Sequence, residues 1–279
     1  NPEINYKKKS KYKFLPRPHF TTNKSSLIFN KKKISEINKI KIYVYLENLF
    51  SLKNIKVKDV VIEEANFNLN KNNYSFFIKL LDNNFKDIKF EILDSKIFYR
   101  NLENEVLFIN NITNAKYIYD INESKNMLYS KNNIFNLPYL IELSNNEDQK
   151  NLNSKIKIES LDFEIENQFS YGEKFNTRLS EFNFSNSISI AEYKTNKNYF
   201  EFKLVDKAQK PKFSYNGKLN FKPFYSNLEG SAIEIDFSHL FSTNGVIKQI
   251  LKTEILNNKN IDFKLNVFVK KIKNFDNFV

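Results

Sequence analysis

The 279-residue sequence contains no cysteine, which excludes disulfides, thiolate metal sites and a cysteine nucleophile. Glycine and proline are scarce, with 4 and 6 residues, and this scarcity argues against disorder, collagen-like repeats and glycine-rich phosphate loops. No run of about 18 apolar residues is present, so no segment is expected to span a membrane as a helix. No signal peptide is visible either.

Aromatic residues are abundant, with 28 phenylalanines and 15 tyrosines. Together with the many isoleucines they favour β-strands. A chain of this length can bury a sizeable core in one or two domains. The composition therefore predicts a mainly β protein.

The formal net charge of +12 is concentrated at one end of the chain. Residues 1–60 hold 15 Lys and Arg against 4 Asp and Glu, whereas the remainder holds 29 against 28. A nucleic-acid-binding domain more often spreads its basic residues over a working face. A basic flank at one end instead favours a membrane-proximal segment or a flexible arm.

Residues 40–69 read as strand, short turn, strand. The first strand has one apolar face, formed by Ile40, Ile42, Val44 and Leu46. The period of two predicts a half-buried strand, and strand periodicity resumes at Ile55 and runs to Leu69. Further along, Asp94 and Ser95 predict a hairpin corner between two strands.

The second half of the chain alternates more clearly. The three-residue step from Ile158 to Leu161 predicts a bulge near Ser160. Gly217 keeps the parity of its neighbours, so we interpret Asn216–Gly217 as part of a strand and not as a hairpin turn. The longest alternation runs from Ile261 to Val269. It follows a predicted helix whose apolar stripe is Ile247, Ile250, Leu251 and Ile255.

These patterns predict repeated antiparallel strands that form a curved, groove-like sheet with one or two short helices. We expect a basic membrane-proximal lead over residues 1–30 and a β domain over residues 31–279. The polar stretch at residues 144–150 is the expected seam between subdomains. A sheet that is apolar on one face must cover that face with another sheet, a helix or something that is not protein.

No group of residues predicts catalysis or metal binding. His19 and His239 lack a second ligand nearby in sequence, so an ordinary polar position is favoured over a metal or acid–base role. The acidic pairs Glu63–Glu64 and Glu103–Glu105 are interpreted as solvated edges and not as a glycosidase pair. Lys41, Tyr43 and Tyr45 share a strand face and could stack on nucleic acid, but a solvent-facing strand is the simpler interpretation.

The order of these elements resembles the AsmA-like family, the large bacterial envelope proteins related to TamB. The resemblance covers most of the chain from about Arg17 and consists of hydrophobic patterns in a fixed order. The matching parts are the basic Arg17–Pro18, the strand Ile40–Leu46, the turn Leu46–Phe50, the strand Ile55–Leu69, and the stretches 92–97, 217–224 and 251–260.

The resemblance implies a non-catalytic protein with no cofactor, anchored in the inner membrane by a helix that would precede Asn1. Its periplasmic body would be an apolar β-groove that carries phospholipid between membranes and serves outer-membrane assembly. Phospholipid acyl chains, the membrane surface near the basic N-terminus and other envelope proteins are then the expected partners, and nucleic acid is not. The expected groove-lining residues are Ile40, Ile42, Val44, Phe200, Phe202, Leu204, Leu219, Phe221, Ile261, Phe263, Leu265 and Val267.

Two other interpretations stay open at this point. The first is a closed β-sandwich or barrel that serves as a protein-interaction module of the cell envelope, with its apolar faces packed as an ordinary core. The second is a nucleic-acid binder led by the basic residues 1–60. Binding that is absent in moderate salt, or unchanged when these residues are removed, would reject it.

Overall fold

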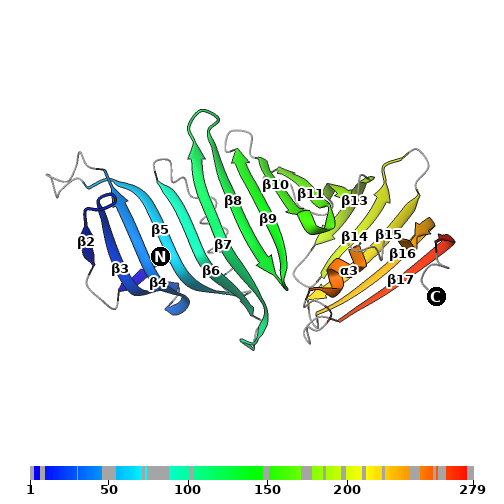
Figure 1. Cartoon of the computed structure of the whole chain (residues 1–279), viewed down its shortest axis with the longest axis horizontal. Helices are drawn as coiled ribbons and strands as arrows, with labels where there is room; N and C mark the ends of the chain where they lie inside the picture. The colour runs from blue at the N-terminus through cyan, green and yellow to red at the C-terminus, as the bar shows by residue number, and fades with distance from the viewer. Residues whose placement is uncertain are drawn as a thin grey trace. The chain divides into compact units, whose positions relative to one another are not determined.

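The computed structural model shows a mainly β protein of mostly antiparallel strands (Figure 1), which confirms the fold class predicted from composition and alternation. The structure describes residues 3–6, 10–29, 31–45, 55–70, 73, 88–100, 103–146, 151–170, 178–184, 187–195, 199–208, 212–221, 224–238, 246–253, 256 and 262–274. Within these ranges, no helix has both the length and the apolar character needed to cross a membrane.

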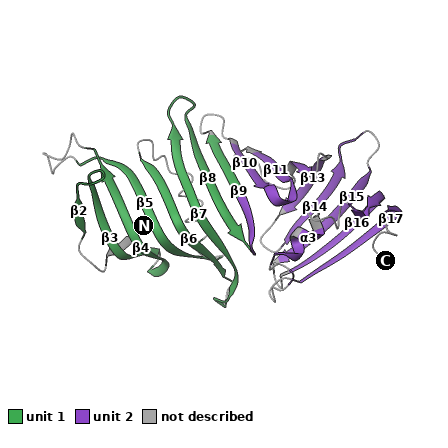
Figure 2. Cartoon of the chain, viewed as in Figure 1, with its two compact units in different colours: residues 1–134, 140–149 green, residues 135–139, 150–279 purple. Residues whose placement is uncertain are grey.

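The chain divides into two compact units, coloured separately in Figure 2. Unit 1 comprises residues 1–134 and 140–149, and unit 2 comprises residues 135–139 and 150–279. The division passes through β9 (Leu137–Asn146), next to the polar stretch in which the sequence suggested a seam.

Unit 1 is a sheet of long strands. Besides β9 it contains β1 (Glu3–Tyr6), β2 (Lys11–Lys13), β3 (His19–Phe29), β4 (Lys32–Val44), β5 (Val57–Leu69), β6 (Lys89–Arg100), β7 (Val106–Asp120) and β8 (Lys125–Ile134). Neighbours from β3 to β8 pair in sequence order, antiparallel except for the parallel pair β5–β6. Both β1 and β2 pair with β3, so residues 3–6, 11–13 and 19–29 of the basic lead contribute strands to this sheet.

Five neighbouring strands of unit 1 are irregular at the same level. Lys24, Glu64 and Asp94 have left-handed backbone conformations, with φ of 56°, 53° and 46°. The register places Asn38 between Lys24 and Glu64, and Thr113 opposite Asp94. We call these five residues the bulge line. At the bulge line the alternation of side chains reverses within a strand, but the register from β3 to β7 does not shift, because each of the five residues faces one residue of the next strand. At this level the register shifts only between β7 and β8, where Thr113 is an extra residue.

The bulge line explains how the apolar face of unit 1 is assembled. On β5, Ile62 and Ala65 both belong to this face although they are three positions apart, and the same holds for Ile40 and Ile37 on β4. A buried cluster forms there from Ile37, Ile40, Ala65 and Phe67, with Ile42, Val60, Ile62, Ile92 and Ile97 packed against it. The hydroxyl of Ser95 accepts a hydrogen bond from the Ala65 amide at 3.0 Å, which satisfies a buried donor beside the cluster.

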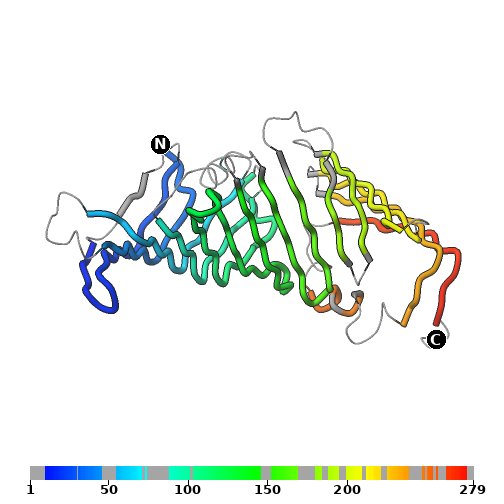
Figure 3. The backbone as a smooth tube through the Cα atoms, turned by 90° about the horizontal axis from the view of Figure 1, so that it is seen from above, coloured from blue at the N-terminus to red at the C-terminus, as the bar shows by residue number. Residues whose placement is uncertain are grey.

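The strands of unit 2 are also mostly antiparallel, and they belong to the same hydrogen-bonded sheet. They are β10 (Asn151–Ile158), β11 (Phe163–Ser170), β12 (Arg178–Phe184), β13 (Ser187–Thr195), β14 (Tyr199–Asp206), β15 (Phe213–Phe221), β16 (Phe224–Asp236) and β17 (Asp262–Lys273). Consecutive strands pair antiparallel up to β16, whereas β16 and β17 are parallel. The connection from β16 to β17 contains α3 (Val246–Leu251), which lies beside η3 (Glu159–Leu161), the turn from β10 to β11 (Figures 1 and 3).

Several local predictions from the sequence are confirmed. Gly217 lies inside β15, and β17 covers the longest predicted alternation from Asp262 onward. The helix α3 covers the predicted apolar stripe up to Leu251. Residues 46–54 and Ile255, which completed the predicted turn and stripe, lie outside the described residues.

Two local predictions are wrong. Asp94 and Ser95 do not form a hairpin corner, because they lie in the middle of β6. Aspartate is common in turns because it tolerates the left-handed conformation, and Asp94 adopts this conformation inside a strand. The irregularity near Ser160 is the 3-10 turn η3 between two strands and not a bulge.

Candidate functional site

The clearest candidate for a binding surface is one face of the unit 2 sheet. Three cross-strand rows run over β14 to β17: Phe200–Leu219–Ser226–Phe263, Phe202–Gly217–Leu228–Leu265 and Leu204–Tyr215–Gly230–Val267. Residues of one row, and of every second position along a strand, share a face. We call this surface the apolar face of unit 2. It brings together residues that the sequence placed on separate strands.

The two glycines of this face lie under aromatic rings. A Cβ at Gly217 would overlap the ring of Phe202 and would lie 2.7 Å from Leu228 Cδ2. A Cβ at Gly230 would overlap the ring of Tyr215 in the same way. The rings therefore lie down along the neighbouring strand, which widens the apolar surface that they cover.

The large side chains of this face keep contact with solvent. Its fully buried members are the small residues, such as Ala191 and Ala232, while the side chains on β14 and β15 are half-buried. On β17, Phe263 is 42% exposed and Leu265 is 54% exposed. Exposed apolar side chains in contiguous rows are uncommon on a monomeric soluble protein and mark an interaction surface.

The opposite face of unit 2 is charged and internally paired. Lys155 Nζ lies 2.7 Å from a carboxylate oxygen of Glu164 and 2.8 Å from one of Glu166, and Lys218 Nζ lies 2.7 Å from one of Glu201. The hydrogen bonds that Lys155 donates to the two glutamates raise its pKa, with the bond to Glu164 the larger cause. Cross-strand pairs of opposite charge are typical of a solvated sheet face.

A hollow on this charged face lies over the middle of β13 to β16. Its lining alternates acidic and basic side chains, including Glu192, Lys194, Glu201, Lys203 and Lys218. The Lys218 ammonium is already held, by Glu201 and by the ring of Tyr199 at 4.4 Å from its centroid. A depression lined by charges of both signs offers little net attraction to a charged ligand.

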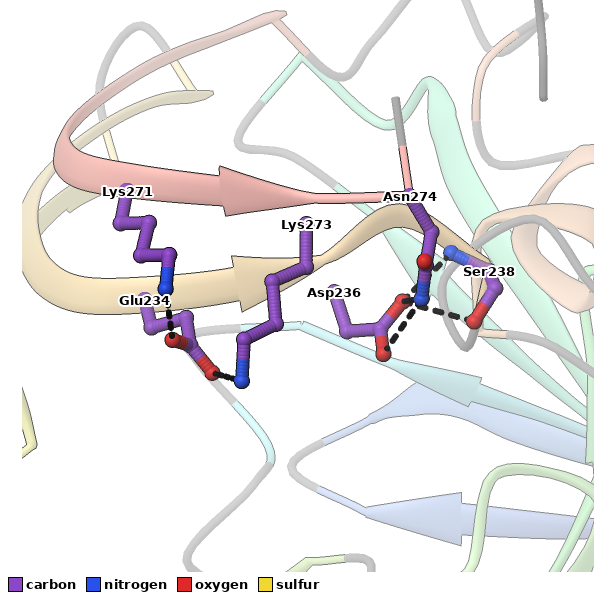
Figure 4. Close-up of polar contacts among 6 residues, drawn as sticks. All are labelled: Glu234, Asp236, Ser238, Lys271, Lys273 and Asn274. Atoms are coloured by element: carbon purple, nitrogen blue, oxygen red, sulfur yellow. Dashed lines mark hydrogen bonds and ion pairs between the residues drawn. The ribbon is translucent and has the colours of Figure 1, made fainter. Parts of the chain in front are cut away.

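A polar cluster fixes the end of β17 against β16 (Figure 4). Glu234 binds Lys273 at 2.6 Å and Lys271 at 3.8 Å. Asp236 accepts hydrogen bonds from Asn274 Nδ2 at 3.0 and 3.1 Å and from the Ser238 amide at 2.9 Å. In the register of the two strands, Glu234 and Lys271 follow Ala232 and Val269 on the apolar face, so charged residues border that face at this end.

The residues predicted in unit 1 have a different environment. Ile40 is 4% exposed and Val44 is 5% exposed, while Ile42 is half-buried beside the core cluster. Of the residues predicted in unit 2, Phe221 lies in β15 but its side chain is outside the described set, and Ile261 is outside it altogether.

The polar residues weighed for chemistry have structural roles. His19 is buried, with its Nδ1 2.6 Å from the Arg17 carbonyl oxygen and its ring beside that of Tyr43. Tyr43 is also buried, with the Arg17 guanidinium 4.3 Å from its ring centroid, so its ring is not free to stack on a base. His239 lies outside the described residues. Within the described ranges, no group of three or more His, Cys, Asp or Glu could hold a metal ion.

Glu63 and Glu64 are not at an edge, because β5 pairs with a neighbour on each side. Lys39 binds Glu63 at 2.8 Å and Lys41 binds it as well. Burial alone would raise the pKa of the Glu63 carboxyl, but hydrogen bonds from the two lysines lower it below the ordinary value. Glu103 and Glu105 are exposed, as expected for a loop.

Sequence reasoning missed the contribution of β13. Ala191 and Tyr193 continue two of the apolar rows from β14, whereas Ile188 and Ile190 lie on the charged face and are exposed. A prediction for β13 based on its two isoleucines would therefore select the charged face. The sequence signal for the apolar face was Tyr193, two positions after Ala191. In the structure the ring of Tyr193 lies 5.4 Å from that of Phe200.

Comparison with known protein families and with characterised proteins finds no match to this chain.

Proposed function

We propose that the apolar face of unit 2 binds phospholipid acyl chains and that the chain is a non-catalytic part of an AsmA-like envelope protein that carries lipid between membranes. One observation carries the proposal: contiguous rows of apolar side chains across β13 to β17 remain partly exposed, while the other face of the same strands carries paired charges.

The chemistry of this surface suits an acyl chain. Such a chain has no polar groups to satisfy, and its binding gains about 0.8 kcal/mol per buried CH₂ without directional contacts. Rings that lie flat over Gly217 and Gly230 make a continuous surface with few gaps between strands. Lys271 and Lys273 lie at the border of the face but pair with Glu234, so the proposed binding rests on the apolar rows.

The order of elements that resembles the AsmA-like family supports the wider part of the proposal. On this basis the protein is anchored in the inner membrane, its body lies in the periplasm, and its role is in lipid transport and outer-membrane assembly. The apolar surface needs neither a cofactor nor a catalytic group for this role.

Photo-crosslinking on the two faces of β17 tests the proposal. A photoreactive residue at position 263 or 265 should capture phospholipid in cells. The same residue at position 268 should not, because Phe268 is 74% exposed but lies on the opposite face of the same strand. Equal capture on both faces would reject a lipid-binding face. Capture of protein alone at 263 and 265 would instead support the protein-interaction module.

A further inference from the structure

We infer that the loop between β2 and β3 is a membrane-docking prong that inserts into the surface of an anionic phospholipid bilayer. Among the described residues, the loop contains the two neighbouring large apolar side chains with the greatest combined exposure: Phe14 is 64% exposed and Leu15 is 83% exposed. Adjacent exposed apolar residues at a loop tip have no role in the core of their own unit.

Basic and aromatic residues flank this apolar tip. Lys11 and Lys13 on β2 are exposed, and Tyr12 lies between them. A tyrosine at the polar–apolar boundary and lysines near it are typical of protein segments that rest in a membrane interface. Each basic residue near an anionic membrane surface also adds to the attraction. The apolar tip, the tyrosine beside it and the two exposed lysines therefore fit the surface of a bilayer with anionic lipids.

The base of the prong is fixed to the sheet. Arg17 donates to Asp59 on β5 at 3.0 Å and its guanidinium lies over the ring of Tyr43 on β4. The Pro18 carbonyl oxygen accepts a hydrogen bond from the Val44 amide at 3.2 Å. Arg17 also neutralises Asp59, so that this carboxylate does not oppose an anionic surface. A fixed base presents the tip without a further entropic cost of ordering on binding.

An aromatic chain joins the tip to the sheet. The ring of Phe14 lies 4.9 Å from that of Tyr12, and the ring of Tyr12 lies 5.0 Å from that of Phe20. Tyr12 and Phe20 are paired in a cross-strand row that continues through Ile42 and Val60 on the apolar face of unit 1. The inserted tip is therefore continuous with apolar surface inside the protein.

Vesicle co-sedimentation of the whole chain tests the inference. The chain should bind vesicles of phosphatidylcholine with phosphatidylglycerol more tightly than vesicles of phosphatidylcholine alone. The double variant Phe14→Ser/Leu15→Ser should weaken binding to both about tenfold or more, and Lys11→Gln/Lys13→Gln should weaken binding to the anionic vesicles alone. Because these side chains are exposed, all variants should keep the wild-type melting temperature.

The matched control is Ile121→Ser, which removes an apolar side chain that is 72% exposed in the turn after β7 of the same unit. It should bind vesicles like the wild type. Absence of vesicle binding by the wild type, or an equal loss in the control and in the Phe14/Leu15 variant, would overturn the inference. The inference does not depend on lipid capture at Phe263, so the two proposals can fail separately.

Discussion

The aromatic ring of Phe202 occupies the space that a Cβ at Gly217 on the neighbouring strand would need. This relationship decides the sign of a simple substitution. A protein with glycine inside a strand is ordinarily less stable than one with alanine there by roughly 0.5–1 kcal/mol, because glycine loses more conformational freedom on folding. At position 217 the overlap with Phe202 and Leu228 opposes that gain.

We expect Gly217→Ala to lower the free energy of unfolding by about 1–3 kcal/mol, the usual cost of overpacking, as measured by urea denaturation. Asn216→Ala, on the exposed face of the same strand, is the control and should change stability much less. The double variant Phe202→Leu/Gly217→Ala should cost less than the sum of its single changes, because a smaller side chain leaves room for the Cβ. A stabilised Gly217→Ala protein would contradict the packing described.

Replacement of Glu63 by glutamine should lower the free energy of unfolding at neutral pH by roughly 1 kcal/mol, because Lys39 and Lys41 lose a shared carboxylate. The pKa of Glu63 is lower in the folded chain than in the unfolded chain. Its carboxylate therefore contributes stability above the unfolded pKa, and this contribution is lost as the pH falls through the folded pKa.

The difference between wild type and Glu63→Gln should thus shrink below about pH 4 in denaturation curves measured over a pH series. Glu103→Gln, at an exposed position before β7, serves as the control at each pH. A difference that stays constant down to strongly acidic pH would show that the triad of Glu63, Lys39 and Lys41 has no electrostatic role in stability.

Replacement of Glu234 by glutamine should loosen the end of β17. The variant loses the ion pairs with Lys271 and Lys273 that are visible in Figure 4. We expect faster amide hydrogen exchange over residues 268–273, with no change in β14 or β15. The effect should diminish at high salt, which already screens exposed ion pairs in the wild type. Equal amide protection of residues 268–273 in the wild type and the variant would show that backbone pairing alone holds β17 in place.

The apolar face of unit 2 could be predicted to a large extent from the sequence. On β14 and β17 the alternation is uninterrupted, so the parity of Phe202 or Leu265 fixes its face once the strand is recognised. Gly217 interrupts the apolar series of β15 but keeps its parity, and its role under the ring of Phe202 depends on a neighbouring strand that sequence order does not specify.

Unit 1 was harder to predict for two physical reasons. The extent of burial at Ile40 depends on everything packed around it, and alternation alone gives only the face. The left-handed conformations of Lys24 and Glu64 have no sequence signature, because lysine and glutamate rarely adopt them. Only Asp94 carried a visible signal, and that signal did not distinguish a bulge from a turn.

The bulge line also couples the lengths of five strands. Deletion of Asp94 alone would restore simple alternation to β6, but it would move either Ile92 or Ile97 to the opposite face. A compensating deletion would then be needed beside it, at Glu64 and at Thr113, and in turn at Asn38 and Lys24. A single-residue insertion or deletion at this line should therefore be tolerated only where the neighbouring strand absorbs it as a bulge, as β8 does beside Thr113.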